Sequence, residues 1–378
     1  MAITIKKVSN RSELKKFVRF NYEFYKNNPY AVPDLYEDMM NTYSKDVRKN
    51  PAFEFCEADC FLAYRDGKIV GRVAAIINHK ANKTWDKKDV RFGCIDFVDD
   101  IEVSRALLDT VAEWGRERGM DSIAGPLGFT DMDPEGMLVE GFDRMGTMAT
   151  IYNYPYYPEH MQRLGFRKDA DWVEYLLKVP DKLPDKHKRI AEMIMKRYDL
   201  RIKKVTKKEV QQEGYGQKIF DLINTAYAPL YGYSKMNQAQ IDVFVRQYLG
   251  ILDLRMVSLV VDKDDNLVAV GITMASISEA LRKAKGKLFP FGWFHLAKAL
   301  FWKRPKVLDL LLVAVAPEYQ NKGVNAILFY DLIPIFKKLG FECGESNPEL
   351  ELNTKVQAQW TYFESEQHKR RRAFRKDL

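Results

Sequence analysis

The sequence predicts an α/β protein built from two domains of similar design. A strand–turn–strand pattern occurs twice, at residues 61–76 with an Asp-Gly turn and at residues 258–275 with an Asp-Asp-Asn turn. Each hairpin is followed by a segment whose apolar residues recur at helical spacing. A charged, proline-bearing stretch without aromatic residues separates the two halves.

Composition sets the broad class. The 378 residues are 46% apolar and 13% aromatic, which is typical of a folded globular chain with room for two cores. Lysine and arginine outnumber aspartate and glutamate by 60 to 52, so phosphates, anionic lipid and nucleic acid are all permitted partners. The four cysteines form no CxxC pair, and we expect buried thiols and no metal site. No stretch has the length of a signal peptide or a spanning helix, which predicts a cytoplasmic protein.

Two amphipathic helices are predicted, one over residues 101–120 and one over residues 324–341, the second with Pro334 inside it. Each ends in a glycine suited to a left-handed cap, Gly119 and Gly340. The domain boundary is expected within residues 178–189, between a first domain at 1–180 and a second at 190–378.

Residues 313–329, VAVAPEYQNKGVNAILF, combine a buried strand, a glycine-bearing turn and a helix start. The first N–H groups of a helix have no intrahelical partner, and the helix dipole adds partial positive charge there. Gly323 allows close approach to the backbone, and Lys322 adds a full charge. This chemistry suits a pyrophosphate, although such a turn is also common as a purely structural helix start.

The motif Val315-x-Pro317-x-x-Gln320-x-x-Gly323 resembles that of the GNAT superfamily of acyl-CoA transferases, with Asn325 where that family usually has glycine or alanine. The resemblance implies two tandem domains, each a mixed, mostly antiparallel sheet flanked by helices. It also implies acyl-CoA or acetyl-CoA as co-substrate, with the pantetheine arm on one strand and the pyrophosphate on the turn. The implied cofactor-binding residues are Val313, Ala314, Val315, Gln320, Asn321, Lys322, Gly323, Val324 and Asn325.

A second family helix has a partial echo in NTKVQAQW, which adds Asn353 to the implied cofactor contacts. The tyrosine that often protonates the leaving thiolate is replaced there by Trp360. Tyr362 is the candidate acid two residues on, although a helix would turn it in another direction. The equivalent turn of the first domain reads DFVDDIEVS; its carboxylates favour a helix start and repel phosphate, so we expect no CoA there.

Residues 125–166 resemble a large bacterial family of tandem-GNAT proteins, some of which are related to enzymes that N-acylate sphingoid bases. A functional interpretation makes this stretch an acceptor pocket facing the second domain; the alternative is ordinary packing. Its candidate substrate-binding residues are Glu135, Asp143, Tyr152, Asn153, Tyr156 and Tyr157, and Glu140 is a candidate base.

The segment at residues 287–306 is rich in aromatic residues and flanked by cations, which is typical of a peripheral membrane contact; a helical hairpin covering the sheet is the alternative. If the segment is helical, Phe289, Trp293 and Leu300 share one face. The basic C-terminal run EQHKRRRAFRKDL is predicted to be a solvent-exposed final strand, with anionic lipid or the CoA 3′-phosphate as functional options. It has no nucleic-acid-binding motif beside it, so nucleic acid is not an expected partner.

The predicted function is acyl-CoA-dependent N-acyl transfer to a primary amine, including a lipidic amine at the surface of the inner membrane. The amine attacks the thioester directly, and a carboxylate takes its proton. The candidate catalytic residues are Glu140, Glu345 and Tyr362, with Glu349 and Glu351 as further candidate bases. Two alternatives remain: a peptidoglycan-bridge type transferase that takes aminoacyl-tRNA, and a non-catalytic CoA- or lipid-binding module.

Overall fold

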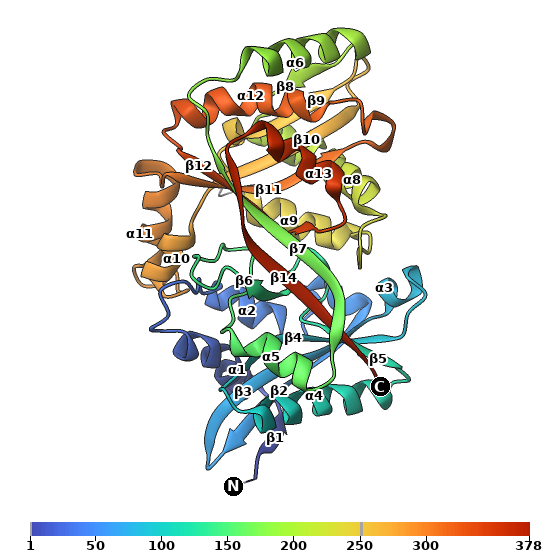
Figure 1. Cartoon of the computed structure of the whole chain (residues 1–378), viewed down its shortest axis with the longest axis vertical. Coiled ribbons are helices and arrows are strands. Elements are labelled where there is room, and N and C mark those ends of the chain that lie inside the picture. Colours follow the sequence, from blue (N-terminus) through green and yellow to red (C-terminus); the bar gives the residue numbers. More distant parts are fainter. Residues whose placement is uncertain (1, 250–251) are drawn as a thin grey trace. The chain divides into compact units, whose positions relative to one another are not determined.

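The computed structural model describes residues 2–249 and 252–378, and the chain divides into two compact units (Figure 1). The first unit comprises Met1–Val173, Ser278–Leu296 and His368–Leu378, and the second comprises Glu174–Ile277 and Ala297–Gln367. The division differs from the contiguous domains expected from the sequence. Strands β7 (Arg167–Lys178) and β14 (Ser365–Asp377) each have residues in both units.

The first unit is a mixed, mostly antiparallel sheet with the order β1-β2-β3-β4-β5-β14. β4 and β5 are parallel, and the short β6 pairs with β14. The predicted Asp-Gly turn joins β2 to β3, and both turn residues have positive φ, +52° at Asp66 and +76° at Gly67. The strands are β1 (Thr4–Lys7), β2 (Cys56–Arg65), β3 (Lys68–Asn78), β4 (Asp89–Phe97), β5 (Ser122–Gly125) and β6 (Met137–Glu140).

Helices cover both faces of this sheet because its strands bury apolar side chains on both sides. α1 (Arg11–Phe24) and α2 (Tyr36–Thr42) pack on one cluster of buried residues, and α4 (Ile101–Arg116) and α5 (Tyr156–Arg163) pack on another. α4 matches the predicted first helix, and Gly119 has φ +75° as expected for its cap. The remaining helical elements are η1 (Pro51–Glu54), α3 (His79–Thr84) and α10 (Ser278–Ala284).

The second unit repeats the plan in the order β7-β12-β11-β10-β9-β8, with β11 and β12 parallel and the other pairs antiparallel. The predicted second hairpin is formed by β9 and β10. The fold class expected from the sequence is therefore confirmed. The strands are β8 (Arg201–Lys203), β9 (Val257–Val261), β10 (Leu267–Ala275), β11 (Val307–Val315), β12 (Cys343–Ser346) and β13 (Glu349–Leu350).

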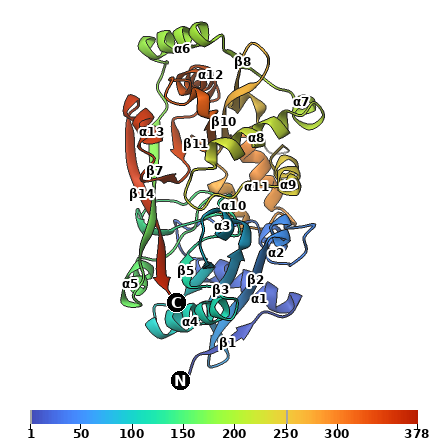
Figure 2. The same cartoon turned by 90° about the vertical axis from the view of Figure 1, so that its right-hand side faces the viewer.

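α6 (Asp185–Tyr198) and α12 (Asn325–Lys338) share one buried cluster on one side of the second unit's strands, and Figure 2 shows α8 (Tyr215–Tyr227) and α9 (Gln238–Leu249) on the other. α12 matches the predicted second helix: it contains Pro334 and is followed by Gly340 at φ +84°. The remaining helical elements are α7 (Lys207–Gln212), η2 (Leu254–Met256), η3 (Lys298–Trp302), η4 (Pro317–Tyr319), α13 (Thr354–Gln357) and η5 (Ala358–Tyr362).

The basic C-terminal run forms β14, but the prediction that this strand is solvent-exposed is wrong. Lys369 and Arg371 are 1% exposed, and Phe374 is equally buried. Arg372 donates to Asp171 at 2.7 Å, which leaves its charge neutralised inside the fold. The run is rich in lysine and arginine because residues of this strand form ion pairs with carboxylates of other strands. The sequence alone does not show this pairing.

The aromatic insert is not one continuous helix. α11 (Gly292–Ala297) begins only after Pro290, so Phe289 does not share a helical face with Trp293. Proline lacks an N–H donor and disfavours helical backbone in the residue before it, which explains the break.

Candidate active site

The predicted CoA turn has the backbone geometry of an anion-binding helix start. β11 leads through η4 into the turn, and α12 begins at Asn325. Gly323 has φ +77°, a conformation that favours glycine. The N–H groups of Gly323, Val324 and Asn325 donate no hydrogen bond to any residue that the structure describes. These donors, together with the positive end of the helix dipole, suit a phosphate group.

Side chains around the turn add charge and anchor it. Lys322 is exposed, with its Nζ 5.1 Å from the ring centroids of both Tyr198 and Tyr319. Gln320 Nε2 donates to the Val315 carbonyl at 3.2 Å, and Asn325 Nδ2 donates to Gln359 Oε1 at 3.2 Å. Asn325, the residue that departs from the GNAT motif, therefore forms a hydrogen bond to η5.

β11 and β12 separate next to the turn. Their parallel pairing ends at Leu310 and Ser346, whereas β11 continues to Val315. A bulge interrupts the β10–β11 register, because Ile272 pairs with Leu312 while Thr273 pairs with Leu310, which leaves Leu311 without a strand partner. The diverging strands therefore leave one edge of β11 without a strand partner beyond Leu310.

Two side chains donate to carbonyls along that stretch of β11. Asn347 Nδ2 donates to the Leu311 carbonyl at 2.8 Å, and the Tyr227 hydroxyl donates to the Val313 carbonyl at 2.9 Å. A strand edge of this kind presents main-chain polar groups to an extended ligand. The pantetheine arm of CoA is such a ligand, and the predicted contacts Val313, Ala314 and Val315 lie here.

Buried carboxylates on three adjacent strands share one face of the second unit's sheet. Asp309 of β11 pairs in register with Glu345 of β12, and Glu345 pairs with Leu176 of β7, two residues from Glu174. Paired residues and residues two apart on a strand point to the same face. Asp309 and Glu174 are 0% exposed and Glu345 is 9% exposed. A carboxylate side chain can accept a proton from a nearby substrate, which is the chemistry of a general base.

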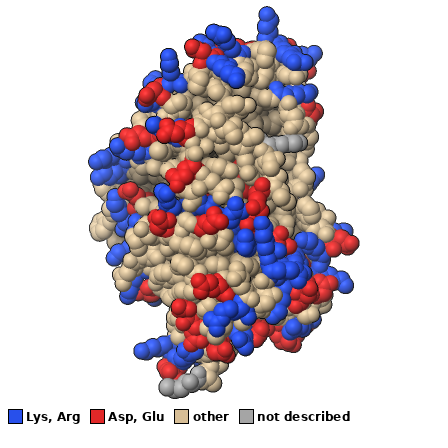
Figure 3. Space-filling view, in the orientation of Figure 1, with Lys and Arg blue, Asp and Glu red and all other residues tan. Residues whose placement is uncertain are grey.

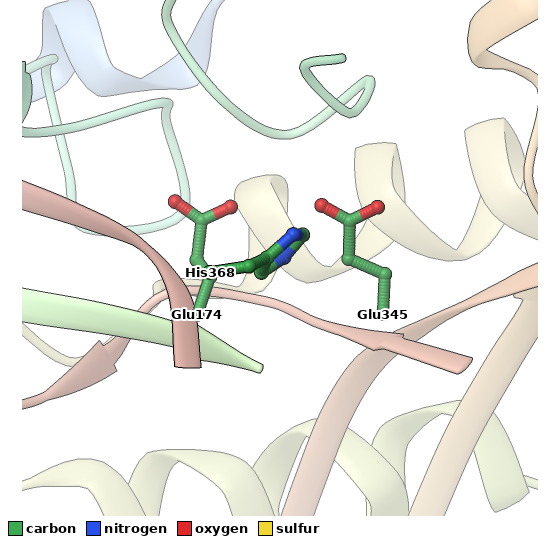
Figure 4. Close-up of side chains that lie close together, drawn as sticks. All are labelled: Glu174, Glu345 and His368. Carbon is green, nitrogen blue, oxygen red and sulfur yellow. The ribbon is translucent and has the colours of Figure 1, made fainter. Parts of the chain in front are cut away.

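Glu174 and Glu345 also lie close to His368 of β14; one ligand atom from each of the three side chains lies within 4.8 Å of the others (Figure 4). Two carboxylates and an imidazole are donor types that can hold a divalent ion as well as exchange protons. The cysteine pattern led to the expectation of no metal site. Glu345 was a predicted candidate, whereas Asp309, Glu174 and His368 were not predicted, because they come from distant strands and show no ligand spacing in the sequence.

Glu349, a further candidate base, has a distinct environment. Burial raises the pKa of Glu349 from the ordinary 4.5 to about 7, and hydrogen bonds from Trp360 and Ser346 lower it in part. Trp360 Nε1 donates to the two carboxylate oxygens at 2.9 and 3.0 Å. The tryptophan that replaces the family tyrosine thus holds a carboxylate whose pKa is near neutrality.

Replacing Glu349 with glutamine is expected to flatten the pH dependence of stability between pH 4.5 and about 7. In this window the unfolded chain has lost the Glu349 proton while the folded chain keeps it, so the free energy of unfolding of the parent protein falls as pH rises. Urea unfolding at both ends of the window measures the change. Glu364→Gln, at an exposed position of the same unit, is the control, and an equal fall in parent and Glu349→Gln proteins would contradict the assignment.

Two other predicted residues of the second unit are Tyr362 and Asn353. Tyr362 is 60% exposed, and its ring lies edge-on to His187 at 5.1 Å between centroids. Asn353 precedes α13, where its N–H donates to the Leu350 carbonyl at 2.8 Å. Their roles as acid and as cofactor contact stay predictions.

In the first unit, the predicted acceptor residues are mostly engaged in internal packing. The Tyr157 hydroxyl accepts from the Phe97 N–H at 3.0 Å, and the Tyr156 hydroxyl donates to the Phe97 carbonyl at 2.6 Å. The Tyr152 hydroxyl donates to the Phe142 carbonyl at 2.9 Å, and Asn153 bonds both backbone groups of Leu138. These contacts match the packing alternative of the sequence analysis, and substrate binding by the four residues stays a prediction.

The acidic candidates of the first unit differ in environment. Burial holds the pKa of Glu135 well above its ordinary value, and nearby Asp131 and Asp133 raise it further. Glu140 is exposed and lies 3.3 Å from Arg370 Nε, whereas Asp143 is exposed at the surface. At the turn equivalent to the CoA turn, the Asp100 carboxylate accepts from the Glu102 N–H at 2.9 Å and caps α4, as the sequence predicts.

No family model matches the chain. It is 24% identical over 376 residues to protein YghO of Escherichia coli, covering 98% of this chain and 94% of the relative. It is also 24% identical over 355 residues to the bacterial ceramide synthase of Caulobacter vibrioides, covering 91% and 88%.

Two solved structures resemble the chain over nearly its full length. A tandem GNAT protein from the clavulanic acid biosynthesis pathway has a TM-score of 0.54 at 12% identity, covering 100% of this chain and 98% of that one. A GCN5-related N-acetyltransferase from Sphaerobacter thermophilus has a TM-score of 0.52 at 9% identity, covering 99% and 95%. The chain therefore has the tandem GNAT fold. Together with the likeness to a bacterial ceramide synthase, this fold supports an N-acyltransferase.

Proposed function

We propose that the second unit binds a long-chain acyl-CoA and transfers its acyl group to the primary amine of a lipid-like acceptor such as sphinganine. The observation that supports the proposal best is the combination, on one strand and its turn, of an unpaired edge and an anion-binding helix start. The likeness to a bacterial ceramide synthase supports the choice of acceptor.

In the proposed reaction the pyrophosphate lies on the N–H groups that follow Gly323 and the pantetheine arm lies along β11. The amine nitrogen attacks the thioester carbonyl carbon, forming the C–N bond, and the C–S bond breaks to release CoA as its thiolate. The carboxylates of Asp309, Glu345 and Glu174 take the amine proton, directly or through water. A backbone N–H near the bulge at Leu311 polarises the carbonyl. The leaving thiolate takes a proton, for which Tyr362 is the predicted donor.

Thiol release provides the test. Purified protein is incubated with palmitoyl-CoA or acetyl-CoA and either sphinganine or ethanolamine, free CoA is measured, and the amide is identified by mass spectrometry. We expect amide formation with sphinganine and palmitoyl-CoA, and much less with ethanolamine, because a short amine has no apolar chain to bind. CoA binding without amide from any acceptor would support the non-catalytic module instead. The part of the first unit in holding the acceptor stays a prediction.

Within residues 2–249 and 252–378, no helix combines the length and apolar character that crossing a bilayer requires.

A further inference from the structure

Large aromatic side chains are exposed between α10 and the start of β11. Phe289 is 79% exposed, Phe291 is 76% exposed and Trp293 is 48% exposed. The same run of chain continues with Phe301 at 55%. Exposed aromatic residues that lie close together along a chain indicate an interaction surface, because transferring their apolar area out of water lowers the free energy.

The aromatic residues are presented by an ordered turn. At its base, the Tyr36 N–H donates to the Gly286 carbonyl at 2.8 Å. Gly286 has φ +68°, and a Cβ there would lie 2.4 Å from the Asp34 carbonyl oxygen, so only glycine allows this contact. Within the turn, the Trp293 N–H donates to the Leu288 carbonyl at 2.8 Å and its indole Nε1 donates to the Pro290 carbonyl at 3.1 Å.

Positively charged residues flank the turn along the sequence. Residues 280–308 contain eight lysines and arginines and no aspartate or glutamate. Lys285, Lys287, Lys298 and Lys303 are exposed. Along the left-hand edge of Figure 3, where α10 and α11 lie in Figure 1, Lys and Arg side chains border uncharged surface. Like charge opposes self-association through this surface, whereas an anionic bilayer complements it.

We propose that residues 287–294 form a membrane-docking turn that inserts its aromatic side chains into the interface of an anionic bilayer. The exposed lysines bind the headgroups, and Phe289, Phe291 and Trp293 enter the boundary between headgroups and acyl chains. The turn lies on the surface of the bilayer, since it is far too short to span it. Docking goes beyond the proposed transferase activity, and its test does not require turnover.

The test is co-sedimentation of the full chain with vesicles of phosphatidylcholine alone or mixed with phosphatidylglycerol. The parent protein is expected to bind the anionic vesicles only. The double variants Phe289→Ser/Phe291→Ser and Lys285→Glu/Lys287→Glu are each expected to weaken binding roughly tenfold or more. The matched controls are Met193→Ser, at an exposed position of α6, and Lys15→Glu/Lys16→Glu, at exposed positions of α1; both should bind like the parent.

Each variant is also checked for an unchanged thermal midpoint and for a CoA-dependent rise of that midpoint, so that misfolding and failure of the CoA site are recognised separately. Binding that is absent, or that survives both turn variants, would overturn the proposal. A concentration-dependent dimer that is lost in Phe289→Ser/Phe291→Ser, measured by sedimentation velocity without lipid, would assign the turn to a second copy of the chain instead.

Discussion

Replacing Gly323 with aspartate is expected to weaken CoA binding roughly 100-fold. The side chain adds a negative charge where the unpaired N–H groups of the turn and the helix dipole favour an anion. It also imposes strain, because Gly323 has φ +77° and its Cβ would lie 2.8 Å from Ile194 Cδ1. Isothermal titration of the purified variant with CoA measures the change in Kd.

Gly340→Asp is the matched control for this substitution. Gly340 follows the other end of α12 and has φ +84°, and a Cβ added there would meet no atom within 4 Å, so the control adds the same charge and similar backbone strain. It should lose some stability and keep its CoA affinity. Equal loss of affinity in the two variants, or none in Gly323→Asp, would show that the turn does not hold the pyrophosphate.

Glu345→Gln is expected to lower kcat roughly 100-fold to 1,000-fold while the Kd for CoA stays close to that of the parent. The amide keeps the shape of the side chain but does not accept the amine proton. The buried position of Glu345 beside Glu174 and Asp309 makes it a member of the group that we propose takes that proton. Steady-state thiol release and CoA titration on the same preparation separate catalysis from binding.

The control for Glu345→Gln is Glu342→Gln, the same chemical change at an exposed residue next to β12. The Glu342 carboxylate forms an ion pair with Lys306 at 2.8 Å. Unchanged turnover in Glu345→Gln, with a loss in Glu349→Gln or Glu140→Gln, would move the base to that residue. Dialysis against a chelator distinguishes the other role of the cluster: turnover lost on chelation and restored by a divalent ion would assign Glu174, Glu345 and His368 to a metal.

Local patterns in the sequence predicted much of the fold. Apolar runs on both sides of the Asp66-Gly67 turn are sufficient to place a hairpin, because only a few backbone conformations close so tight a turn. Helical spacing and glycine caps placed α4 and α12, and the motif around Gly323 placed the turn between β11 and α12. Each of these features depends on residues that are neighbours along the chain.

Features that depend on strand pairing were not predictable in the same way. Glu174 and Glu345 share a sheet face only because β7 pairs with β12, and nothing near either residue encodes that pairing. Lys369 and Arg371 of β14 are buried for the same reason. A helix through Phe289 could have been excluded from the sequence, because Pro290 disfavours helical backbone in the residue before it.

The proposed acyl transfer along β11 requires that the turn at Gly323 bind CoA. A thermal-shift panel with CoA, acetyl-CoA and palmitoyl-CoA tests that binding most directly. Because a ligand that binds only the folded state stabilises it by about 2.7 kcal/mol at 100 times its Kd, binding must raise the unfolding midpoint. We expect all three ligands to stabilise the parent and Gly340→Asp proteins, palmitoyl-CoA most strongly, and none to stabilise Gly323→Asp. An unchanged midpoint in the parent protein, or an equal rise in Gly323→Asp, would contradict acyl-CoA binding at this site and favour aminoacyl-tRNA or a purely structural turn.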